Sequence, residues 1–345
     1  MPGRTTVIQH EVHTPPGVCV RVRSYRIPEA QRNEVVREVE AMKRLDVIEE
    51  SSSPWNSPIV MVAKPNGTWR FCNDFRQLNQ VSKFDSYPMP RVDELIERLG
   101  SAKYLTTLDL TKGYWQIPLS PKSREKTAFA TPLGLFQYKV MPFGLHGAPA
   151  TFQRLMDIIL RPHAQYASAY IDDIVIFTDS WETHLEKVNA VLQSLREAAL
   201  TANPEKCFVG LQEAQYLGFV VGGGKVKPQT SKVEAITNWP IPRDKKQVRA
   251  FLGLAGYYRR FVPEFSSIAT PLTDLIKKSA PVRVKWSPEA DKAFKAIKQI
   301  LCDSPVLKVP DFSQPFILQT DASEFYLIQT EIMSQRKKYI CGDQS

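Results

Sequence analysis

The stretch that decides the fold is Ala-Ser-Ala-Tyr-Ile-Asp-Asp-Ile-Val-Ile-Phe, residues 167–177. Short β-branched and aromatic runs, typical of strands, flank the adjacent carboxylates Asp172 and Asp173. Neighbouring side chains in a regular strand point to opposite faces, and a buried strand does not tolerate unpaired carboxylates. The pattern therefore predicts a tight hairpin with both aspartates at its turn. Such a pair suits Mg²⁺, although an ordinary polar turn is the alternative.

Composition narrows the class of protein. The 345 residues carry a net charge of +9, from 45 Lys and Arg against 36 Asp and Glu, which favours a polyanionic partner such as nucleic acid. The five cysteines form no CxxC pair, so neither a zinc site nor a disulfide framework is indicated. No apolar run approaches the roughly 18 residues of a membrane span, and residues 1–20 lack the core of a signal peptide. We expect an intracellular protein of the cytoplasm, of a particle or of the nucleus, without a membrane partner.

A second hairpin is predicted near the N-terminus. Strand-like runs at 59–63 and 68–72 are joined by Lys-Pro-Asn-Gly, and Asn-Gly between such runs is a strong hairpin signal. The hairpin carries Lys64 at its tip and Arg70 on its return strand, with Arg76 just beyond. Two cations on a stiff hairpin can clamp a triphosphate. The alternative is a solvated edge charged against aggregation.

A third carboxylate stands at the end of another predicted strand. Residues 104–110 read as a strand that reaches Asp109, and Tyr114 follows in Thr-Lys-Gly-Tyr-Trp. By itself, an aspartate at a strand end is more often a cap or turn residue. Downstream, the Gly/Pro-rich loop 141–152 opens onto a helix at 152–160, and its small residues permit close approach of another backbone or of a base pair.

Apolar spacing predicts further helices at 29–48, 93–99, 181–199, 232–238 and 245–261, and Ser287 caps another. For 181–199 the predicted apolar stripe is Trp181, Leu185, Val188, Leu192 and Leu195. The surface of 245–261 is basic, which favours contact with a phosphate backbone but also fits a merely solvated face. Its basic residues are Lys245, Lys246, Arg249, Arg259 and Arg260.

Together, three carboxylates at two strand ends, a cationic hairpin and a basic surface are the parts of a two-metal phosphoryl-transfer site. Two Mg²⁺ ions about 4 Å apart need carboxylates from separate chain segments, to activate an attacking 3′-hydroxyl and to stabilise the leaving pyrophosphate. Asp109, Asp172 and Asp173 provide them.

Five ordered blocks resemble the reverse transcriptase of gypsy-type long-terminal-repeat retrotransposons. The likeness covers roughly residues 10–325. Tyr-Ile-Asp-Asp at 170–173 is similar to the family's YxDD box, and Leu-Asp-Leu-Thr-Lys-Gly-Tyr-Trp-Gln-Ile-Pro at 108–118 to the preceding aspartate motif. The other blocks lie at 69–79, 141–153 and 251–261. YxDD alone is a weak motif, whereas five blocks in order are highly specific.

The resemblance implies an α+β right-hand polymerase fold of fingers, palm and thumb, followed by a connection and a truncated ribonuclease H-like segment. The expected boundaries are an N-terminal arm or linker at 1–28, fingers and palm at 29–225, the thumb at 226–270, the connection at 271–312 and the ribonuclease H-like start at 313–345.

The resemblance also implies roles for individual residues. Asp109, Asp172 and Asp173 become catalytic ligands of two Mg²⁺ ions, with Mn²⁺ able to replace them. The incoming nucleotide is contacted by Lys64, Arg70, Tyr114 and Phe143, where Tyr114 is the gate against a ribose 2′-hydroxyl. Nucleic acid is expected to contact Tyr170, Leu217, Gly218, Phe219, Lys245, Lys246, Arg249, Arg259 and Arg260.

Two departures from the family pattern stand out. Gly147 occupies a position where the family often has Asn. The Gln-Thr-Asp-Ala-Ser stretch opens like ribonuclease H, with Asp321 as its first carboxylate, but unrelated sequence follows Phe325. We therefore expect a fragment without ribonuclease H activity, whose residues from 313 onward form a partly ordered tail.

Three functions compete. The first is an RNA-directed DNA polymerase that uses deoxynucleoside triphosphates and an RNA or DNA template with a primer. The second is a decayed or co-opted element fragment that binds nucleic acid without catalysis. A nuclease using the same carboxylates is the third, and it leaves Tyr114 and the cationic hairpin unexplained. The intact polymerase blocks favour the first function, and the divergent tail favours the second.

Overall fold

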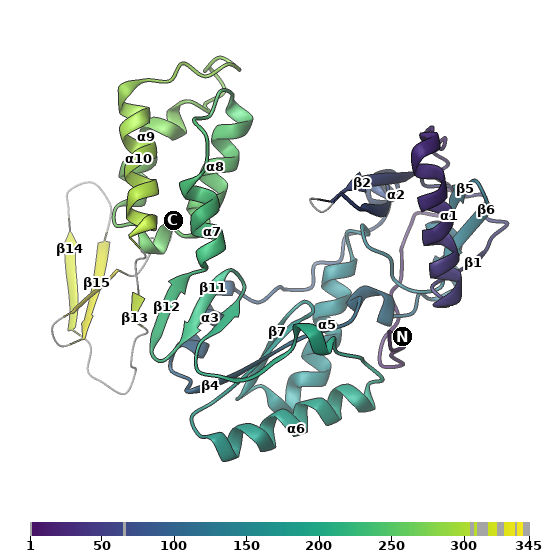
Figure 1. Ribbon diagram of the computed structural model, residues 1–345, viewed down its shortest axis with the longest axis horizontal. Coiled ribbons are helices and arrows are strands. Elements are labelled where there is room, and N and C mark those ends of the chain that lie inside the picture. Colours follow the sequence, from purple (N-terminus) through teal and green to yellow (C-terminus); the bar gives the residue numbers. More distant parts are fainter. Residues whose placement is uncertain are drawn as a thin grey trace. The chain divides into compact units, whose positions relative to one another are not determined.

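The computed structural model describes residues 2–64, 67–303, 307–308, 317–322, 328–334 and 337–340. The chain divides into two compact units (Figure 1). The first comprises Met1–Pro90 with Thr106–Gly210, and the second comprises Arg91–Leu105 with Leu211–Ser345. The predicted domain boundaries at 28, 225, 270 and 312 stay predictions.

A four-stranded sheet carries the candidate site of the first unit. Its strand order is β7-β8-β4-β9. Helix α5 packs on β7 and helix α6 packs on β8. The bounds are β4 Tyr104–Asp109, β7 Ala167–Tyr170, β8 Asp173–Thr178, β9 Phe208–Leu211, α5 Ala148–Leu160 and α6 Trp181–Glu197.

Helix α6 begins where the sequence predicts, because the Ser180 side chain accepts a hydrogen bond from the Thr183 backbone N–H. Its predicted apolar stripe is partly wrong. Leu185 is 47% exposed, and Trp181 and Leu192 are similarly exposed. The buried face instead consists of His184, Val188, Val191 and Leu195.

The other part of the first unit contains the predicted hairpin, here β2 Ile59–Ala63 paired with β3 Trp69–Asn73. It also contains α1 Glu29–Arg44 and a three-stranded sheet of order β1-β6-β5. The remaining elements are β1 Ile48–Glu50, β5 Phe129–Thr131, β6 Gly134–Tyr138, α2 Arg76–Val81, α4 Pro121–Arg124, η1 Gly113–Gln116, η2 Glu125–Thr127, η3 Arg161–His163 and η4 Pro204–Lys206.

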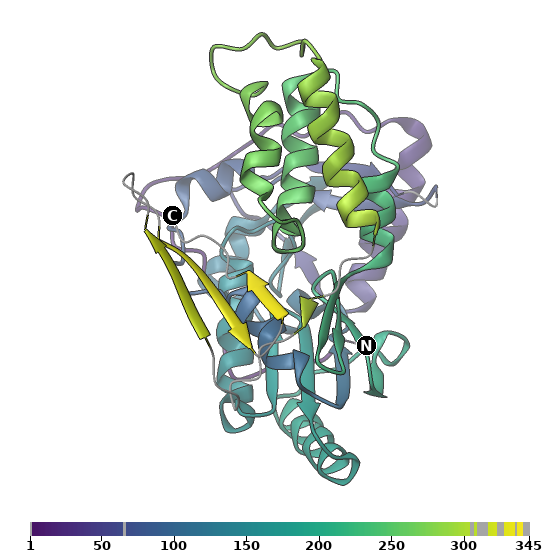
Figure 2. The ribbon, with the colours of Figure 1, turned by 90° about the vertical axis from the view of Figure 1, so that its left-hand side faces the viewer.

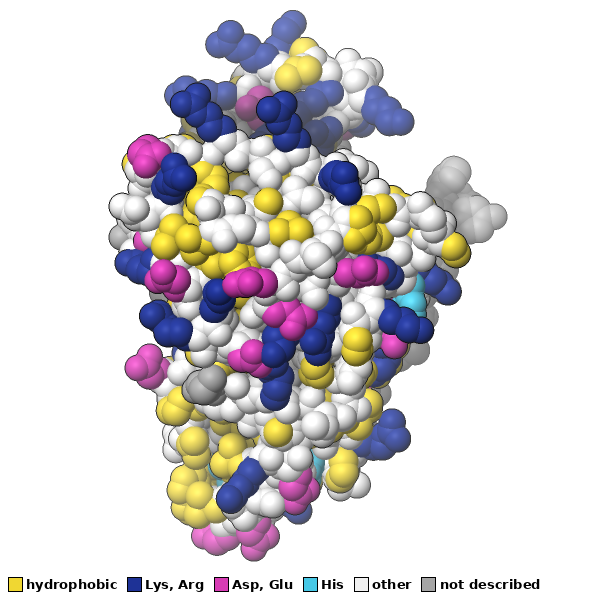
Figure 3. All heavy atoms as spheres, turned by 90° about the vertical axis from the view of Figure 1, so that its right-hand side faces the viewer, with side chains coloured by type: hydrophobic (Ala, Val, Ile, Leu, Met, Phe, Trp, Pro, Cys, Tyr) yellow, Lys and Arg dark blue, Asp and Glu magenta, His cyan; other side chains and the backbone are white. Residues whose placement is uncertain are grey.

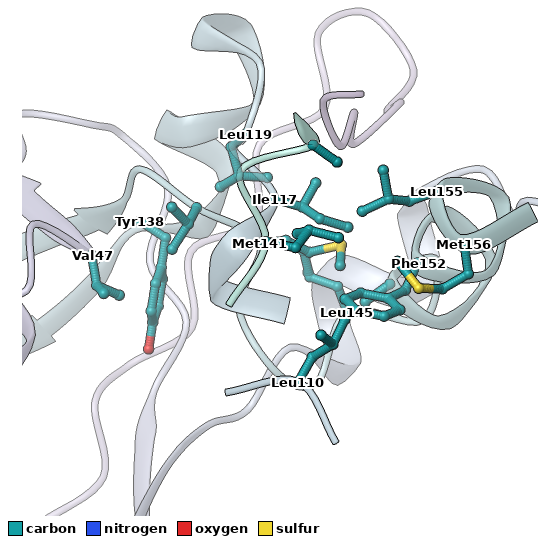
Figure 4. Packing of buried hydrophobic residues seen from close by; sticks show 14 of the residues in the cluster. Val47, Leu110, Ile117, Leu119, Tyr138, Met141, Leu145, Phe152, Leu155 and Met156 are labelled. Carbon is teal, nitrogen blue, oxygen red and sulfur yellow. The ribbon is translucent and has the colours of Figure 1, made fainter. Parts of the chain in front are cut away.

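One continuous hydrophobic core joins these parts of the first unit. Figure 4 shows Phe152 and Met156 of α5 facing Leu110, Met141 and Leu145. Because each fully buried side chain of this size contributes roughly 1.5–3 kcal/mol, the core holds the loops around Asp109 against α5. The hydrophobic core therefore supports the segments that carry the carboxylates.

The N-terminal arm is bound to the first unit along much of its length, more closely than the prediction of an arm or linker suggests. The Thr5 and His10 backbone N–H groups donate to the carbonyls of Gln116 and Pro118. Further along, the Val22 N–H donates to the Asn56 carbonyl. The arm is thus an integral layer of this unit.

The second unit has a sheet of order β10-β11-β12-β13, on which α3 packs, and a group of helices. Helices α9 and α10 lie side by side in both Figures 1 and 2, and α10 also contacts α7. The bounds are α3 Val92–Gly100, β10 Ala214–Tyr216, β11 Phe219–Gly222, β12 Lys225–Pro228, β13 Leu307–Lys308, α7 Thr230–Thr237, α8 Lys245–Tyr257, η5 Arg259–Phe261, α9 Phe265–Asp274 and α10 Pro288–Cys302.

The last described strands form a separate antiparallel sheet, β14-β15-β16. They are β14 Ile317–Ala322, β15 Ile328–Ser334 and β16 Lys337–Ile340. The sequence predicts a strand that ends near Asp321, and Asp321 lies in β14. It does not predict β15 or β16. The expectation of a partly ordered tail from residue 313 onward stays a prediction. The neighbouring residues 309–316, 323–327 and 341–345 lie outside the described part of the chain.

Candidate active site

The hairpin turn that the sequence predicts is present, with Asp172 in the turn and Asp173 at the start of β8 rather than in the turn. Tyr170 and Asp173 are cross-strand partners, so Ile171 and Asp172 form a two-residue turn between β7 and β8. Ile171 has a φ of 57°, a left-handed conformation that is strained for a β-branched residue. Strain of this kind persists only where the surroundings impose it.

Gln153 of α5 holds that turn. Its Oε1 accepts a hydrogen bond from the Ile171 backbone N–H at 2.9 Å, and its Nε2 donates to the Ala169 carbonyl at 3.2 Å. Gln153 is fully buried. Sequence reasoning missed this residue, although a glutamine among the buried apolar residues of a helix is a detectable signal.

Asp109 ends β4, which lies next to β8 in the sheet. Its backbone carbonyl accepts a hydrogen bond from the Asn203 N–H at 2.8 Å. Its carboxylate forms an ion pair with the Lys206 ammonium at 3.3 Å. The sequence did not single out Lys206, because it lies nearly a hundred residues from Asp109.

Electrostatics couple the three carboxylates. Burial raises the pKa of Asp172, and the neighbouring negative charge of Asp109 raises it further. For Asp173, burial and then the charges of Asp172 and Asp109 raise the pKa to about 6, even though its side chain keeps an exposed face. Lys206 lowers both pKa values. The three aspartates therefore form one cluster in which like charges repel.

The cluster has the donor chemistry of a hard-cation site. In the described part of the chain, no three His, Cys, Asp or Glu side chains already converge at metal-binding geometry, and Lys206 partly neutralises Asp109. Carboxylate oxygens are nevertheless the ligands that Mg²⁺ prefers, and a bound cation would offset the repulsion that raises the pKa values. The residues present fit the metal.

Tyr114 lies near Asp172, and its ring packs against two other aromatic rings. The Tyr114 ring lies 5.0 Å from the Phe143 ring, centroid to centroid, and 5.7 Å from Phe152. Burial and the nearby Asp172 raise the pKa of Tyr114 to about 12. Phe143 is 55% exposed, so it offers an open apolar face.

Gly113 allows this close packing. A Cβ atom at position 113 would lie 3.1 Å from the Phe152 ring and 3.2 Å from the Asp172 Cβ. A larger residue at position 113 would require the Phe152 ring or the Asp172 side chain to shift by a few tenths of an ångström. The sequence placed Gly113 in a motif without assigning it this role.

The cations of the β2–β3 hairpin are exposed. Val62 pairs with Arg70, and the Lys64 N–H donates to the Thr68 carbonyl, while residues 65–66 lie outside the described chain. None of the described contacts joins Lys64 or Arg70 to the aspartates. Arg76 instead pairs with Asp74, whose pKa it holds at about 2.

In the second unit, Leu217 and Gly218 form a left-handed turn between β10 and β11. The hydroxyls of Tyr257 and Tyr258 donate to their carbonyls at 2.7 and 2.8 Å. Phe219 is buried against these two tyrosines, so its side chain supports the turn and offers little surface of its own.

The predicted basic residues of α8 and η5 differ in their exposure and in their side-chain partners. Lys246, Arg249 and Arg259 are exposed. Arg260 pairs with Glu97 at 3.1 Å, and the Lys245 ammonium donates to the Lys277 carbonyl. Figure 3 shows Lys and Arg side chains gathered at the end of this helical group.

A cavity of about 520 Å³ lies elsewhere in the first unit, between the N-terminal arm, the segment after α2 and the loop 145–147. Gly147 is among its lining residues. A Cβ atom on Gly147 would lie 3.2 Å from the His10 ring, so a larger residue there would press against the arm.

These features define a right-hand polymerase fold, in which two strand ends of one sheet carry three carboxylates. Comparison with known proteins agrees. Residues 62–221 match the family described as "Reverse transcriptase (RNA-dependent DNA polymerase)", and residues 286–340 match the "RNase H-like domain found in reverse transcriptase". The chain belongs to the reverse transcriptase family.

Its relatives are polyproteins of mobile elements. The chain is 40% identical over 329 residues to the retrovirus-related Pol polyprotein from transposon 297 of Drosophila melanogaster, covering 94% of this chain and 31% of that protein. It is 37% identical over 336 residues to the Pol polyprotein from transposon gypsy of the same organism, covering 92% and 32%. The chain thus spans about a third of the length of these relatives.

Solved structures share the fold. The foamy viral protease-reverse transcriptase in complex with dsDNA aligns with a TM-score of 0.87 at 26% identity, over 99% of this chain and 71% of that chain. The same viral protein in complex with an RNA/DNA hybrid aligns with a TM-score of 0.84 at 25% identity, over 99% and 46%. No helix in the described part of the chain is long and apolar enough to cross a membrane.

Proposed function

We propose that this chain is the polymerase part of a retrotransposon Pol polyprotein and that it synthesises DNA on an RNA or DNA template. It adds deoxynucleotides to a primer 3′-hydroxyl. The observation that carries the proposal is the single cluster of Asp109, Asp172 and Asp173, whose mutual repulsion favours bound cations.

Asp109, Asp172 and Asp173 would hold two Mg²⁺ ions, and Mn²⁺ can replace Mg²⁺. When bound, such ions favour deprotonation of the 3′-hydroxyl and neutralise charge on the leaving pyrophosphate. The chain itself holds the carboxylates in fixed positions, because β4 and β8 lie side by side and Gln153 holds the turn.

The nucleotide is held by side chains around this cluster. Tyr114 lies under the sugar and excludes a 2′-hydroxyl, and Phe143 packs beside the nucleotide. Lys64 and Arg70 neutralise the triphosphate, and Arg offers a bidentate fork. Their exposure on a hairpin leaves them accessible to an anionic ligand.

Primer and template are contacted by the second group of predicted residues. The Leu217-Gly218 turn, supported by Phe219, meets the primer, as does Tyr170 beside the carboxylates. Lys245, Lys246, Arg249, Arg259 and Arg260 follow the phosphate backbone; of these, the exposed side chains should contribute most.

One observation favours the second function, nucleic-acid binding without catalysis. The Lys206 ammonium already pairs with Asp109 at 3.3 Å. If this pair persists in the presence of Mg²⁺, Asp109 cannot act as a full metal ligand.

Primer extension on an RNA template with Mg²⁺ tests the proposal. Asp172→Asn should abolish extension and leave template–primer binding intact, because the removed charge serves the metal ions. Asp179→Asn is the matched control, since it changes an exposed aspartate just past the other end of β8. Equal extension by Asp172→Asn and the parent would refute the site. A parent that binds but never extends would favour the second function.

A further inference from the structure

A buried amide, which the proposed chemistry does not use, closes the loop after Asp109. Gln116 is the last residue of η1, and it is completely buried. Its Nε2 donates to the carbonyls of Thr111 and Thr201, each at 2.9 Å. Its Oε1 accepts from the Thr201 N–H at 2.7 Å. All these partners are backbone groups.

The partners flank the catalytic carboxylate. The Thr111 N–H donates to the Thr201 carbonyl, Leu110 forms an antiparallel bridge with Ala202, and the Asn203 N–H donates to the Asp109 carbonyl. Residues 109–111 and 201–203 therefore continue the strand pairing past the end of β4. The Gln116 side chain closes the far end of this short ladder.

The same side chain closes the loop that carries Tyr114. Residues 111–116 form a loop that leaves the ladder at Thr111 and returns to it through the Gln116 amide. The Tyr114 ring stands on this loop. One amide therefore joins the backbone that carries Asp109 to the backbone that carries Tyr114.

The N-terminal arm covers the amide. The Thr5 N–H donates to the Gln116 carbonyl at 2.8 Å, and Thr5 is 1% exposed. A Cβ atom on Gly3 would lie 2.0 Å from the Ala199 carbonyl oxygen. With water excluded, the bonds of the amide have no substitute partner, so losing them is costly.

We infer that Gln116 is a positioning residue: it sets the distance between the Asp109 carboxylate and the Tyr114 ring for the nucleotidyl transfer proposed above, on which this inference rests. A residue that only filled the core would need volume alone. Gln116 instead uses both amide donors and its carbonyl oxygen on the two segments that flank the carboxylate.

Gln116→Met tests this role, because methionine has similar volume and reach but cannot form these bonds. The control is Thr127→Val, which also removes buried hydrogen bonds in the first unit, to the Arg124 carbonyl and from the Tyr138 N–H. Gln116→Asn retains the amide with a shorter reach, and it replaces Gln116→Met if the latter unfolds.

The first measurement is amide hydrogen exchange of the parent and both variants, without substrate. In Gln116→Met, exchange in residues 109–117 and 199–204 should rise by roughly tenfold or more, the scale of one or two lost buried hydrogen bonds. Thr127→Val should leave these segments unchanged. Unchanged exchange in a folded Gln116→Met would overturn the inference.

The second measurement is nucleotide selectivity at equal template–primer occupancy. Gln116→Met should lower kcat and reduce the preference for deoxyribonucleotides over ribonucleotides, while Thr127→Val keeps that preference. Faster exchange with unchanged kcat and preference would reduce Gln116 to a structural residue and overturn the positioning role. A parent that never extends primers would instead refute the proposed function itself.

Discussion

The left-handed backbone of Ile171 shows how single residues determine the geometry of the site. Such a conformation costs on the order of 1–3 kcal/mol for a residue of this type. The turn is held by the Gln153 amide, which bonds to the backbone on both sides of Tyr170. Two buried glutamines, Gln153 and Gln116, thus hold the loops that present the aspartates.

Tyr114 should select the sugar of the incoming nucleotide. Replacing it with alanine removes the ring that would collide with a 2′-hydroxyl, so ribonucleotide incorporation should rise by one to two orders of magnitude relative to deoxyribonucleotides, the range of a steric contact worth roughly 1–3 kcal/mol. Tyr114→Phe keeps the ring and should keep the preference. Single-nucleotide incorporation measures both variants. An unchanged ratio in a folded Tyr114→Ala would exclude the gate.

Stability should fall on acidification because of His10. Burial, the largest cause, lowers its pKa from 6.5 to about 4, while Asp85 partly opposes the shift. Between these two pKa values the unfolded chain therefore binds a proton at His10, whereas the folded chain does not. The contribution of neutral His10 to the free energy of unfolding is fully present above pH 6.5. It is lost as the pH falls toward 4, by an amount on the order of 3 kcal/mol.

Urea unfolding at pH 7.0 and 5.0 measures this effect. His10→Gln should be less stable than the parent at pH 7.0, because it loses the bond to Thr151, but should show a shallower fall toward pH 5.0. His13→Gln is the control, since His13 is exposed. Equal slopes for His10→Gln and the parent would show that another group titrates.

Some of these residues could be predicted from sequence and others could not. Adjacent aspartates between two strand-like runs have few structural solutions, so a hairpin turn at the Asp pair follows from local physics, and Ile171 and Asp172 form it. Gln116, Gln153 and Gly113 act through backbone groups and rings far away in sequence. A polar residue in a motif carries no sign of whether it faces water or a buried carbonyl.

At the scale of elements, helix α6 shows where apolar spacing misleads. The helix was predicted, but only Val188 and Leu195 of its predicted apolar stripe are buried, and His184 was left out of the stripe because it counts as polar in the pattern. In the structure its ring lies between the hydroxyls of Thr106 and Thr178, at 2.7 and 2.9 Å. Those partners come from β4 and β8, so only the assembled sheet makes this position suitable for histidine.

The terminal sheet leads to a prediction about ribonuclease H. In the described residues, β14 to β16 are three strands, and Asp321 lies in the first of them. A two-metal nuclease needs several carboxylates that converge from strands and helices, and the described residues of this sheet provide strands alone. We expect the chain not to cleave RNA in an RNA–DNA hybrid.

The assay is a labelled hybrid incubated with Mg²⁺ or Mn²⁺. Cleavage that disappears in Asp321→Asn would contradict the prediction. Cleavage that is insensitive to this change would indicate a contaminating nuclease. In that case Asp172→Asn protein purified in parallel should show the same cleavage.

At the scale of the whole molecule, a net charge of +9 should make nucleic-acid binding depend steeply on salt. Lys246→Gln with Arg249→Gln removes two exposed charges from α8. If both meet phosphates, the slope of log Kd against log salt should fall by roughly 2, about 0.9 for each contact. Kd values measured between 50 and 200 mM salt report this slope, because binding through phosphate contacts weakens steeply in this range.

The control is Arg32→Gln with Arg37→Gln on α1, which removes the same net charge from residues that pair with neighbouring glutamates. An equal fall in both double variants would mean that net charge, rather than contacts of α8, sets the slope.

The strand order β7-β8-β4-β9 has a consequence for how the protein is made. Strand β4 emerges from the ribosome early, yet both of its sheet neighbours lie far downstream, β8 at 173–178 and β9 at 208–211. Contacts between such distant segments slow folding, because long loops must close before any pairing is gained. Asp109 is therefore synthesised long before the strands that position it, and the nascent chain exposes an unpaired β4 during that interval. Synthesis rate and chaperone access become determinants of the yield of native protein.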